Sequence, residues 1–178
     1  MTARFVTAAG LAALCLLTAA PETACARPAT GRGSAASPEL QAFVSRVVRQ
    51  LNGAGEAPES DVDPVFSRLF GDNVDLAGER LHGYDFRNDP VCQCFESGND
   101  HYTLVSLTQR SPTSAEARIR YGSPASAYTL VLEHFSRHWR IRDALTVTGS
   151  NRAILTRHNA CMRASHDEAQ IRRCFGDD

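Results

Sequence analysis

Lysine is absent from this chain of 178 residues, so arginine supplies all of the positive side-chain charge that does not depend on histidine. No block of like charge occurs, and the formal net charge is only −1 at pH 7. Nucleic-acid-binding domains present a basic patch, and acidic interaction tails contain runs of carboxylates. The charge pattern therefore excludes both classes and predicts no nucleic-acid partner. A chain without lysine is typical of a GC-rich genome. The alternative, in which arginine is chosen for bidentate binding of an anion, would need a cluster of arginines, and the sequence shows none.

Motifs that mark common catalytic sites are also missing. The chain contains no G-x-S-x-G nucleophile elbow, no H-E-x-x-H zinc motif and no phosphate-binding loop. The sequence therefore selects no reaction by motif, and we expect no cofactor.

The first 26 residues have the form of a secretory signal peptide. Arg4 precedes an apolar run from Phe5 to Ala20, and Ala24-Cys25-Ala26 supplies small residues at the expected cleavage position. The apolar run is too short to serve as a membrane span. We therefore predict a periplasmic or secreted protein, in which residues 27–37, rich in Gly, Ser, Ala and Pro, form a flexible linker.

A second kind of processing is compatible with the same segment. Thr23-Ala24-Cys25 partly resembles the cleavage site of a bacterial lipoprotein, in which Cys25 would carry the lipid. Glu22 departs from that pattern, because an aliphatic residue is expected there. Both alternatives stay open, and contact with a membrane is expected only if Cys25 is lipidated.

Four cysteines follow the signal peptide, namely Cys92, Cys94, Cys161 and Cys174. An even number in an exported chain argues for disulfides. The favoured pairing joins Cys161 to Cys174 across a short loop, while Cys92 and Cys94 pair with each other or stay reduced. The alternative ties Cys92 and Cys94 to the C-terminal segment.

Helical periodicity is clearest after the linker. Ser37 is a suitable N-cap, Pro38 is suited to the first helical position, and Gly53 can end the helix. Its apolar stripe consists of Leu40, Phe43, Val44, Val47, Val48 and Leu51. Two short helices should follow, one over residues 63–71 and the other over residues 72–83.

Four strand-like runs occupy residues 101–146, and they read HYTLVSLTQ, SAEARIRY, AYTLVLEHF and HWRIRDALT. Only short turns separate them, so no crossover helix fits and the sheet must be an antiparallel meander. The third run is apolar on both faces and should be central, and Ser136-Arg137 should form the turn that follows it. Residues 150–175 read as two helices, with Ser165 and Glu168 as a capping box for the second.

These patterns predict an α+β fold. A curved antiparallel four-stranded meander is packed by the long N-terminal helix and the two short helices, and a C-terminal helical tail follows. The expected domains are a cone-like unit over residues 38–157 and a disulfide-stapled tail over residues 158–178.

This organisation resembles the nuclear-transport-factor-like, or ketosteroid-isomerase-like, cone fold. The W-R-I-R-D-A segment from Trp139 to Ala144 is similar to the last-strand pattern of that superfamily. The D-P-V-C-Q-C stretch with the meander after it is similar to a family of bacterial exported proteins and lipoproteins of unknown function. The resemblance covers about residues 38–157. It implies a concave pocket between sheet and helices and a homodimer through the open sheet face, but the isomerases' catalytic set has no matching positions here.

Asp143 is the first candidate for chemistry. It is expected on the apolar face of the fourth run with Trp139, Ile141 and Leu145, where desolvation would favour a general base or a buried donor. The alternative is a structural carboxylate, paired with an arginine at the end of the sheet or placed on a face that curvature exposes.

His134 and Tyr84 are the other candidates. His134 should share a face of the third run with Tyr128, Leu130 and Leu132, and it would act as a base or ligand only beside a placed partner. Otherwise it is a core or rim histidine. Tyr84 could line the mouth of a pocket, although turn residues have this composition anyway.

Metal sites are weakly indicated. The acidic residues before and within the short helices are Asp61, Asp63, Asp72 and Asp75. Their spacing lacks the alternating ligands and central glycine of an EF-hand loop, and helix capping explains Asp63 and Asp72. Cys92, Cys94 and His101 lack further ligands for zinc. We therefore expect no metal.

The leading interpretation is an exported, non-catalytic binding protein of the bacterial envelope that contacts a protein partner or a small ligand. An immunity-type role, in which the protein blocks a toxic enzyme delivered to the periplasm, belongs to this class. The first alternative is a small isomerase or hydrolase that uses Asp143 with His134 or Tyr84. It requires an open cavity, not one filled by the apolar side chains Tyr121, Leu130, Trp139 and Ile141. The second is an envelope-assembly lipoprotein anchored at Cys25.

Overall fold

The computed structural model describes residues 35–54, 57–78, 91–92, 101–122 and 126–175. By its contacts the chain divides into Met1–Thr30 and Gly31–Asp178, and every element described below belongs to the second unit. The predicted signal peptide with Cys25, most of the linker, Tyr84 and Cys94 lie outside the described residues. Within the described ranges, no helix is long and apolar enough to cross a membrane.

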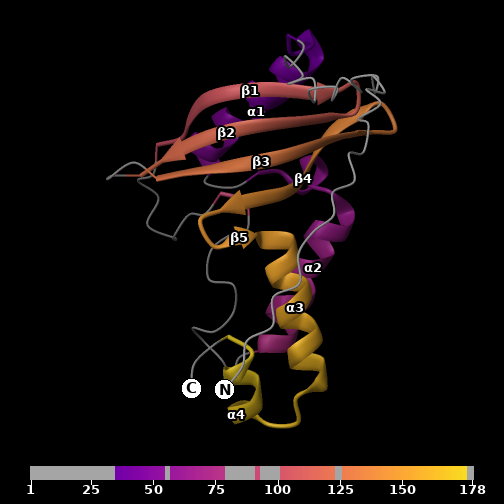
Figure 1. The fold of residues 1–178 in the computed structure, drawn as a ribbon, viewed down its shortest axis with the longest axis vertical. Helices are drawn as coiled ribbons and strands as arrows, with labels where there is room; N and C mark the ends of the chain where they lie inside the picture. Colours follow the sequence, from indigo (N-terminus) through magenta and orange to yellow (C-terminus); the bar gives the residue numbers. More distant parts are fainter. Residues whose placement is uncertain (1–34, 55–56, 79–90, 93–100, 123–125, 176–178) are drawn as a thin grey trace, which may run out of the picture. The chain divides into compact units, whose positions relative to one another are not determined.

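The fold contains a five-stranded antiparallel sheet (Figure 1). Its strands are β1 (Thr103–Ser111), β2 (Ser114–Tyr121), β3 (Ser126–Phe135), β4 (His138–Thr146) and β5 (Gly149–Ser150), and they lie side by side in sequence order. The predicted α+β class and the antiparallel meander are therefore confirmed, with β3 in the middle. The prediction of four strands missed β5, which is only two residues long.

The β3–β4 hairpin turns at the predicted residues. Ser136 and Arg137 both adopt left-handed backbone conformations, with φ of 48° and 74°, and Phe135 pairs with His138 across the turn. Two left-handed residues match the twist of a two-residue hairpin, although neither is a glycine or asparagine. The register of the hairpin is therefore set by more than the turn residues.

The helix α1 (Pro38–Ala54) packs on one face of the sheet. Its start is fixed by Ser37, whose Oγ accepts a hydrogen bond of 3.2 Å from the Leu40 backbone N–H, as expected for an N-cap. The side chain of Gln109 in β1 accepts another, of 2.9 Å, from the Ser37 N–H. Ala115 and Ala117 of β2 are fully buried in the same core.

A single helix, α2 (Pro64–Ala77), replaces the two short helices expected here. Asp63 caps it by accepting hydrogen bonds from the N–H groups of the first turn, and the chain continues through Gly71 to Gly78. A glycine inside a helix costs only about 1 kcal/mol relative to alanine, which tertiary packing can outweigh. Gly78, with φ of 58°, is the residue that ends the helix, so the stop predicted at Gly71 is wrong.

The packing that keeps α2 helical past Gly71 comes from α3 (Asn151–Ala164), which lies beside it (Figure 1). Asn73 and Asn159 are fully buried, and the Asn73 Nδ2 donates to the Asn159 Oδ1 over 2.9 Å. The Asn159 Nδ2 donates in turn to the Leu69 carbonyl over 2.8 Å. This buried polar pair fixes the register of the two helices, because shifting it would leave amide groups without partners.

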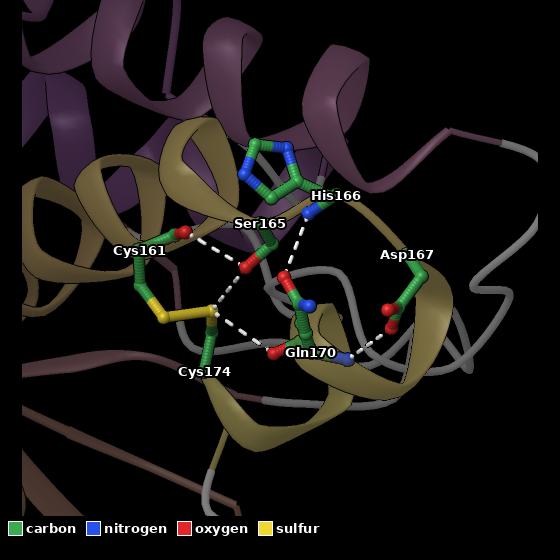
Figure 2. The surroundings of a disulfide bond; sticks show 6 residues. All are labelled: Cys161, Ser165, His166, Asp167, Gln170 and Cys174. Carbon is green, nitrogen blue, oxygen red and sulfur yellow. Dashed lines mark hydrogen bonds between the residues drawn. A yellow bond between two sulfur atoms is a disulfide. The ribbon is translucent and has the colours of Figure 1, made fainter.

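The last helix, α4 (Glu168–Arg173), is capped by Asp167 and not by the predicted Ser165 (Figure 2). The Asp167 side chain accepts a 2.8 Å hydrogen bond from the Gln170 N–H. Ser165 ends α3 instead, and its hydroxyl donates to the Cys161 carbonyl over 2.9 Å. Asp167 lies only two residues after Ser165, and aspartate is as good an N-cap residue as serine. The capping-box pattern therefore selected the wrong one of two suitable residues. The expected domain boundary at residues 157/158 falls inside α3.

A disulfide of the predicted pairing joins Cys161 in α3 to Cys174 at the end of α4, with 5.7 Å between the Cα atoms (Figure 2). Cys92 is fully buried in the main core and is also disulfide-bonded. Because Cys161 and Cys174 bond to each other, the alternative that ties both Cys92 and Cys94 to the tail is wrong. Removal of the tail disulfide should release α4 from the small apolar cluster that it completes with α2 and α3.

We predict that the double substitution Cys161→Ser and Cys174→Ser destabilises the helical tail by about 3 kcal/mol, since the bond closes a short loop in the unfolded chain. Amide hydrogen exchange should accelerate across Glu168–Arg173, while the amides of β3 serve as an internal control and keep their protection. Unchanged exchange in α4 would contradict a structural role for this disulfide.

His158 makes the stability of the tail sensitive to pH. Its pKa is lowered below the ordinary value of 6.5, first by burial and second by the positive charge of Arg157, and its ring packs on Phe175 with 4.7 Å between centroids. The unfolded chain therefore takes up this proton more readily than the folded protein does. The contribution of His158 to the free energy of unfolding is therefore fully present above pH 6.5, and it is lost as the pH falls toward the lowered pKa of the folded protein. Urea unfolding across this range should show the loss in wild type and in the control His166→Gln, but not in His158→Gln.

Candidate functional site

Asp143 does not lie on the core face of β4. Val131 pairs with Asp143 while the adjacent Leu132 pairs with Ile141, so Arg142 is an extra residue that forms a bulge. The bulge reverses the alternation of side chains beyond it. Ile141 and Ala144 are consequently both buried, and Asp143 projects from the opposite side of the sheet. The expectation that Asp143 shares the apolar face with Trp139 and Ile141 is therefore wrong, because the sequence pattern assumed an unbroken strand.

The carboxylate of Asp143 is occupied by the start of α3. Its Oδ1 accepts hydrogen bonds from the backbone N–H groups of Ala144, at 2.8 Å, and Arg152, at 2.9 Å. Its Oδ2 accepts a hydrogen bond of 2.5 Å from the hydroxyl of Ser150, which itself caps α3 by accepting from the Ala153 N–H. A carboxylate beside a helix N-terminus is stabilised by the helix dipole. These contacts account for Asp143 as a structural residue.

His134 is a rim residue on the core side of β3, about a quarter exposed. Its ring lies edge-on to Trp139, with 5.2 Å between centroids, and its Nε2 is 3.4 Å from a carboxylate oxygen of Glu39 in α1. Since His134 and Asp143 project from opposite sides of the sheet, the structure does not bring these two candidates together. The third candidate, Tyr84, lies outside the described residues.

The core face of the sheet is filled by side chains. Leu130, Trp139 and Ile141 are buried, and Tyr121 packs against the same core with its ring edge-on to Tyr128. A small isomerase or hydrolase that used Asp143 with His134 or Tyr84 would need open space between these residues. The apolar side chains occupy that space.

The acidic residues around α2 are used in ion pairs and caps. Asp61 pairs with Arg46, Asp63 caps α2 and pairs with Arg152, and the carboxylate of Asp72 pairs with Arg163. Asp72 and Asp75 also line a hollow of about 450 Å³ beside α2, together with Glu59 and Arg68. In the part of the chain that the structure describes, no group of three or more His, Cys, Asp or Glu side chains is placed to hold a metal ion.

A cleft of about 500 Å³ lies between α1, the 3-10 turn η1 (Glu59–Asp61) and the beginning of β4. We call it the β4 cleft. It is lined by Glu39, Ala42, Phe43, Arg46, Ser60, Asp61, His138, Trp139 and Arg140. One end is closed where the chain after η1 joins the edge of β4, through a bridge between Val62 and Ile141 and a 2.8 Å hydrogen bond from the Asp63 N–H to the Ile141 carbonyl.

One arginine of the β4 cleft, Arg46, is held by two hydrogen bonds. The Arg46 Nη2 lies 2.8 Å from Asp61 Oδ1 and its Nε lies 3.2 Å from Oδ2, which is a bidentate pair with a buried carboxylate. The same guanidinium lies over the ring of Phe43, 5.3 Å from the centroid. Arg46 thus presents a positive charge in one orientation, with an aromatic ring beneath it.

The other arginine, Arg140, is partly buried and differently placed. Its Nε is buried and has no hydrogen-bond partner, and no ion pair involves it within the described residues. A buried N–H without an acceptor is costly, by about 1–3 kcal/mol, and such groups are uncommon in folded proteins. Arg140 therefore combines a place in the wall of the β4 cleft with a buried Nε that has no acceptor among the described residues.

Sequence reasoning missed the β4 cleft, because its residues come from three segments that are not adjacent in the chain. Arg46 reads as a member of the polar face of an amphipathic helix, and Arg140 as an outward residue between Trp139 and Ile141. The W-R-I-R segment was the only local signal, since it places an arginine beside the single tryptophan.

The chain matches no protein-family model, and a comparison with curated proteins found no match to it.

We predict that Asp143→Ala destabilises the protein by about 1–3 kcal/mol, because the substitution removes the acceptor for three hydrogen bonds at the start of α3. Asp143→Asn keeps one acceptor oxygen and should cost less. Urea unfolding of both variants measures the difference. A change within about 0.5 kcal/mol for Asp143→Ala, the range of ordinary surface substitutions, would contradict the capping role.

Proposed function

We propose that this chain is an exported, non-catalytic binding protein of the bacterial envelope that contacts a protein partner through the β4 cleft. The observation that carries the proposal is the composition of that cleft. Two arginines and the exposed His138 surround the aromatic side chains of Phe43 and Trp139. Arginine and tryptophan are the residues most enriched among energetically dominant contacts in protein interfaces.

The disulfide between Cys161 and Cys174 is consistent with a periplasmic or extracellular location. The buried, disulfide-bonded Cys92 supports the same kind of compartment. Export by an N-terminal signal peptide is the part of the proposal that rests on residues 1–26 of the sequence, and Edman sequencing of the mature N-terminus would test it.

The positions of the catalytic candidates also support a binding role. The Asp143 carboxylate caps a helix, His134 pairs with Glu39 on the other side of the sheet, and apolar side chains fill the core face. Binding needs none of these groups to be free. An arginine already bonded to Asp61 and buried aromatic rings, by contrast, lower the entropic cost of association, because these side chains are partly ordered before binding.

An immunity-type role is the most specific form of this proposal, in which the partner is a toxic enzyme delivered to the periplasm. A lytic enzyme encoded in a neighbouring reading frame and inhibited by the purified protein would support this form. Absence of any such enzyme from the neighbouring reading frames would argue against it and would leave the broader binding role in place.

We predict that affinity capture of the mature protein from an envelope extract yields a stoichiometric partner whose recovery depends on Arg140. Arg140→Ala should reduce recovery roughly tenfold or more, the effect expected for loss of a contact worth about 1.4 kcal/mol or above. Mass spectrometry of the captured material measures the recovery.

The matched control is Arg118→Ala, which removes an exposed arginine from β2, outside the β4 cleft. It should leave capture unchanged. Equal capture by wild type, Arg140→Ala and Arg118→Ala would place the partner elsewhere on the protein and reject the β4 cleft as the contact.

A further inference from the structure

We infer that the Cys161–Cys174 disulfide is a thiol-exchange site, at which a dithiol reductant releases α4 from α2 and α3 while the rest of the protein stays folded. Neither the β4 cleft nor the proposed function takes part in this exchange. Three features of the tail support it, namely the exposure of Cys161, the local hydrogen bonding of α4 and the separation of the tail's apolar contacts from the main core.

The disulfide joins two residues of different exposure. Cys161 is exposed, whereas Cys174 is partly buried. Cys161 lies inside α3, where the backbone is largely covered by its neighbours, so the exposed area belongs mainly to the short side chain that carries the sulfur. Exchange requires direct approach of a thiolate to a sulfur atom, and exposed disulfides are accordingly the labile ones. The sulfur of Cys161 is therefore the one that an incoming thiolate attacks.

The exchange takes place in two steps. A thiolate of the reductant attacks Cys161 Sγ and forms a mixed disulfide, while the bond to Cys174 breaks and the Cys174 thiolate takes up a proton. The second thiol of the reductant, as its thiolate, then attacks the reductant's sulfur in the mixed disulfide. This step frees Cys161, which also takes up a proton, and leaves the reductant as an intramolecular disulfide. Two electrons and two protons pass from the reductant to the protein.

The hydrogen bonds that shape α4 are formed within the tail itself (Figure 2). The Asp167 side chain accepts from the Gln170 N–H, and the Gln170 side chain accepts a 2.8 Å hydrogen bond from the His166 N–H. Arg172 pairs with Glu168, one turn before it. A helix of six residues is too short to persist in water by local contacts of this kind. α4 therefore depends on its attachment to the helices beside it, and the disulfide is the covalent part of that attachment.

The apolar part of the attachment is small. The residues that meet between α2, α3 and the end of the chain form the tail cluster, which consists of Leu76, Ala77, Met162, Ile171, Cys174 and Phe175. No residue of α4 is fully buried in it. Fixing the backbone costs conformational entropy at every residue of the tail, and partial burial of a few side chains returns less than full burial would. Once the disulfide is open, these contacts alone do not hold α4 in place.

Release of α4 opens the tail cluster and leaves the main core intact. Ala77 and Met162 are the buried members of the tail cluster, each only 3 % exposed, and Ile171, Cys174 and Phe175 pack against them. The main core, with α1 and the sheet, is a separate cluster of buried residues. Local opening of this kind needs less free energy than global unfolding. Reduction therefore exposes Met162 in a protein that is otherwise folded.

The first measurement is the order in which the cysteines react. The oxidised mature protein would be incubated with dithiothreitol in the absence of denaturant, quenched at intervals with iodoacetamide and mapped by mass spectrometry. Cys161 and Cys174 should be alkylated while Cys92, which is fully buried, stays unmodified. Glutathione disulfide, added in place of iodoacetamide, should restore the tail disulfide. Alkylation of the tail cysteines only together with Cys92 would show that the disulfide opens on global unfolding alone, and would overturn the inference.

The second measurement uses Met162, which is the only methionine of the chain besides Met1. Hydrogen peroxide converts an accessible methionine to its sulfoxide. In the double variant Cys161→Ser and Cys174→Ser, Met162 should be oxidised roughly tenfold faster than in wild type or more, because the closed loop no longer favours the docked tail. Wild type that has been reduced and alkylated should show the same increase. Protected amides in β3 check that the sheet is folded in both forms.

The matched control is Glu168→Gln, which removes the ion pair with Arg172 inside α4 and keeps the disulfide. Its Met162 should be oxidised at the rate of wild type. Equal rates in the double variant and in wild type would mean that α4 stays docked without the disulfide, and would overturn the inference. A fast rate in Glu168→Gln would overturn it as well, because release of α4 would then not depend on thiol exchange.

Discussion

A single extra residue in β4, Arg142, determines how α3 is attached to the sheet. The bulge at Arg142 turns Asp143 to the side opposite Ile141, where the carboxylate meets the backbone N–H groups at the start of α3. Without the bulge, the alternation of the strand would place Asp143 in the apolar core and Ala144 outside it. The cost of burying a carboxylate there would be several kcal/mol, so the bulge and the helix start depend on each other.

The same strand also fixes the start of α2, and this explains why α2 and α3 run in the same direction. The Asp63 N–H donates to the Ile141 carbonyl, and the Asp63 side chain caps α2. Both helices therefore begin at β4, with their positive dipole ends close together. A carboxylate at each start, Asp63 for α2 and Asp143 for α3, compensates the positive ends. The guanidinium of Arg152 joins the two starts by donating to Asp63 and to the Arg142 carbonyl. Further along, the buried Asn73–Asn159 pair keeps the helices in register.

The sequence determines the elements whose signals are local. Ser37 and Pro38 mark the start of α1, the short turns require an antiparallel order, and the spacing of Cys161 and Cys174 suits a closed loop. The predictions that were wrong concern elements that depend on contacts between residues far apart in the sequence. Gly71 reads as a helix stop, because the packing of α3 on α2 that overrides it comes from residues about 80 positions later. The bulge in β4 likewise has no local signal.

The charged residues of the candidate site could not be assigned from the sequence for the same reason. Arginine without lysine reads from sequence as genome composition, since no cluster of arginines is visible along the chain. Among the described arginines whose side chains make hydrogen bonds or ion pairs, most are matched to carboxylates from other elements, as Arg46 is to Asp61 and Arg163 to Asp72. Arg140 is distinguished only against this background, because it lies partly buried, lines the β4 cleft and keeps an Nε without an acceptor. A candidate site of this kind depends on which charged side chains are paired, so it becomes visible only in the folded arrangement of the described residues.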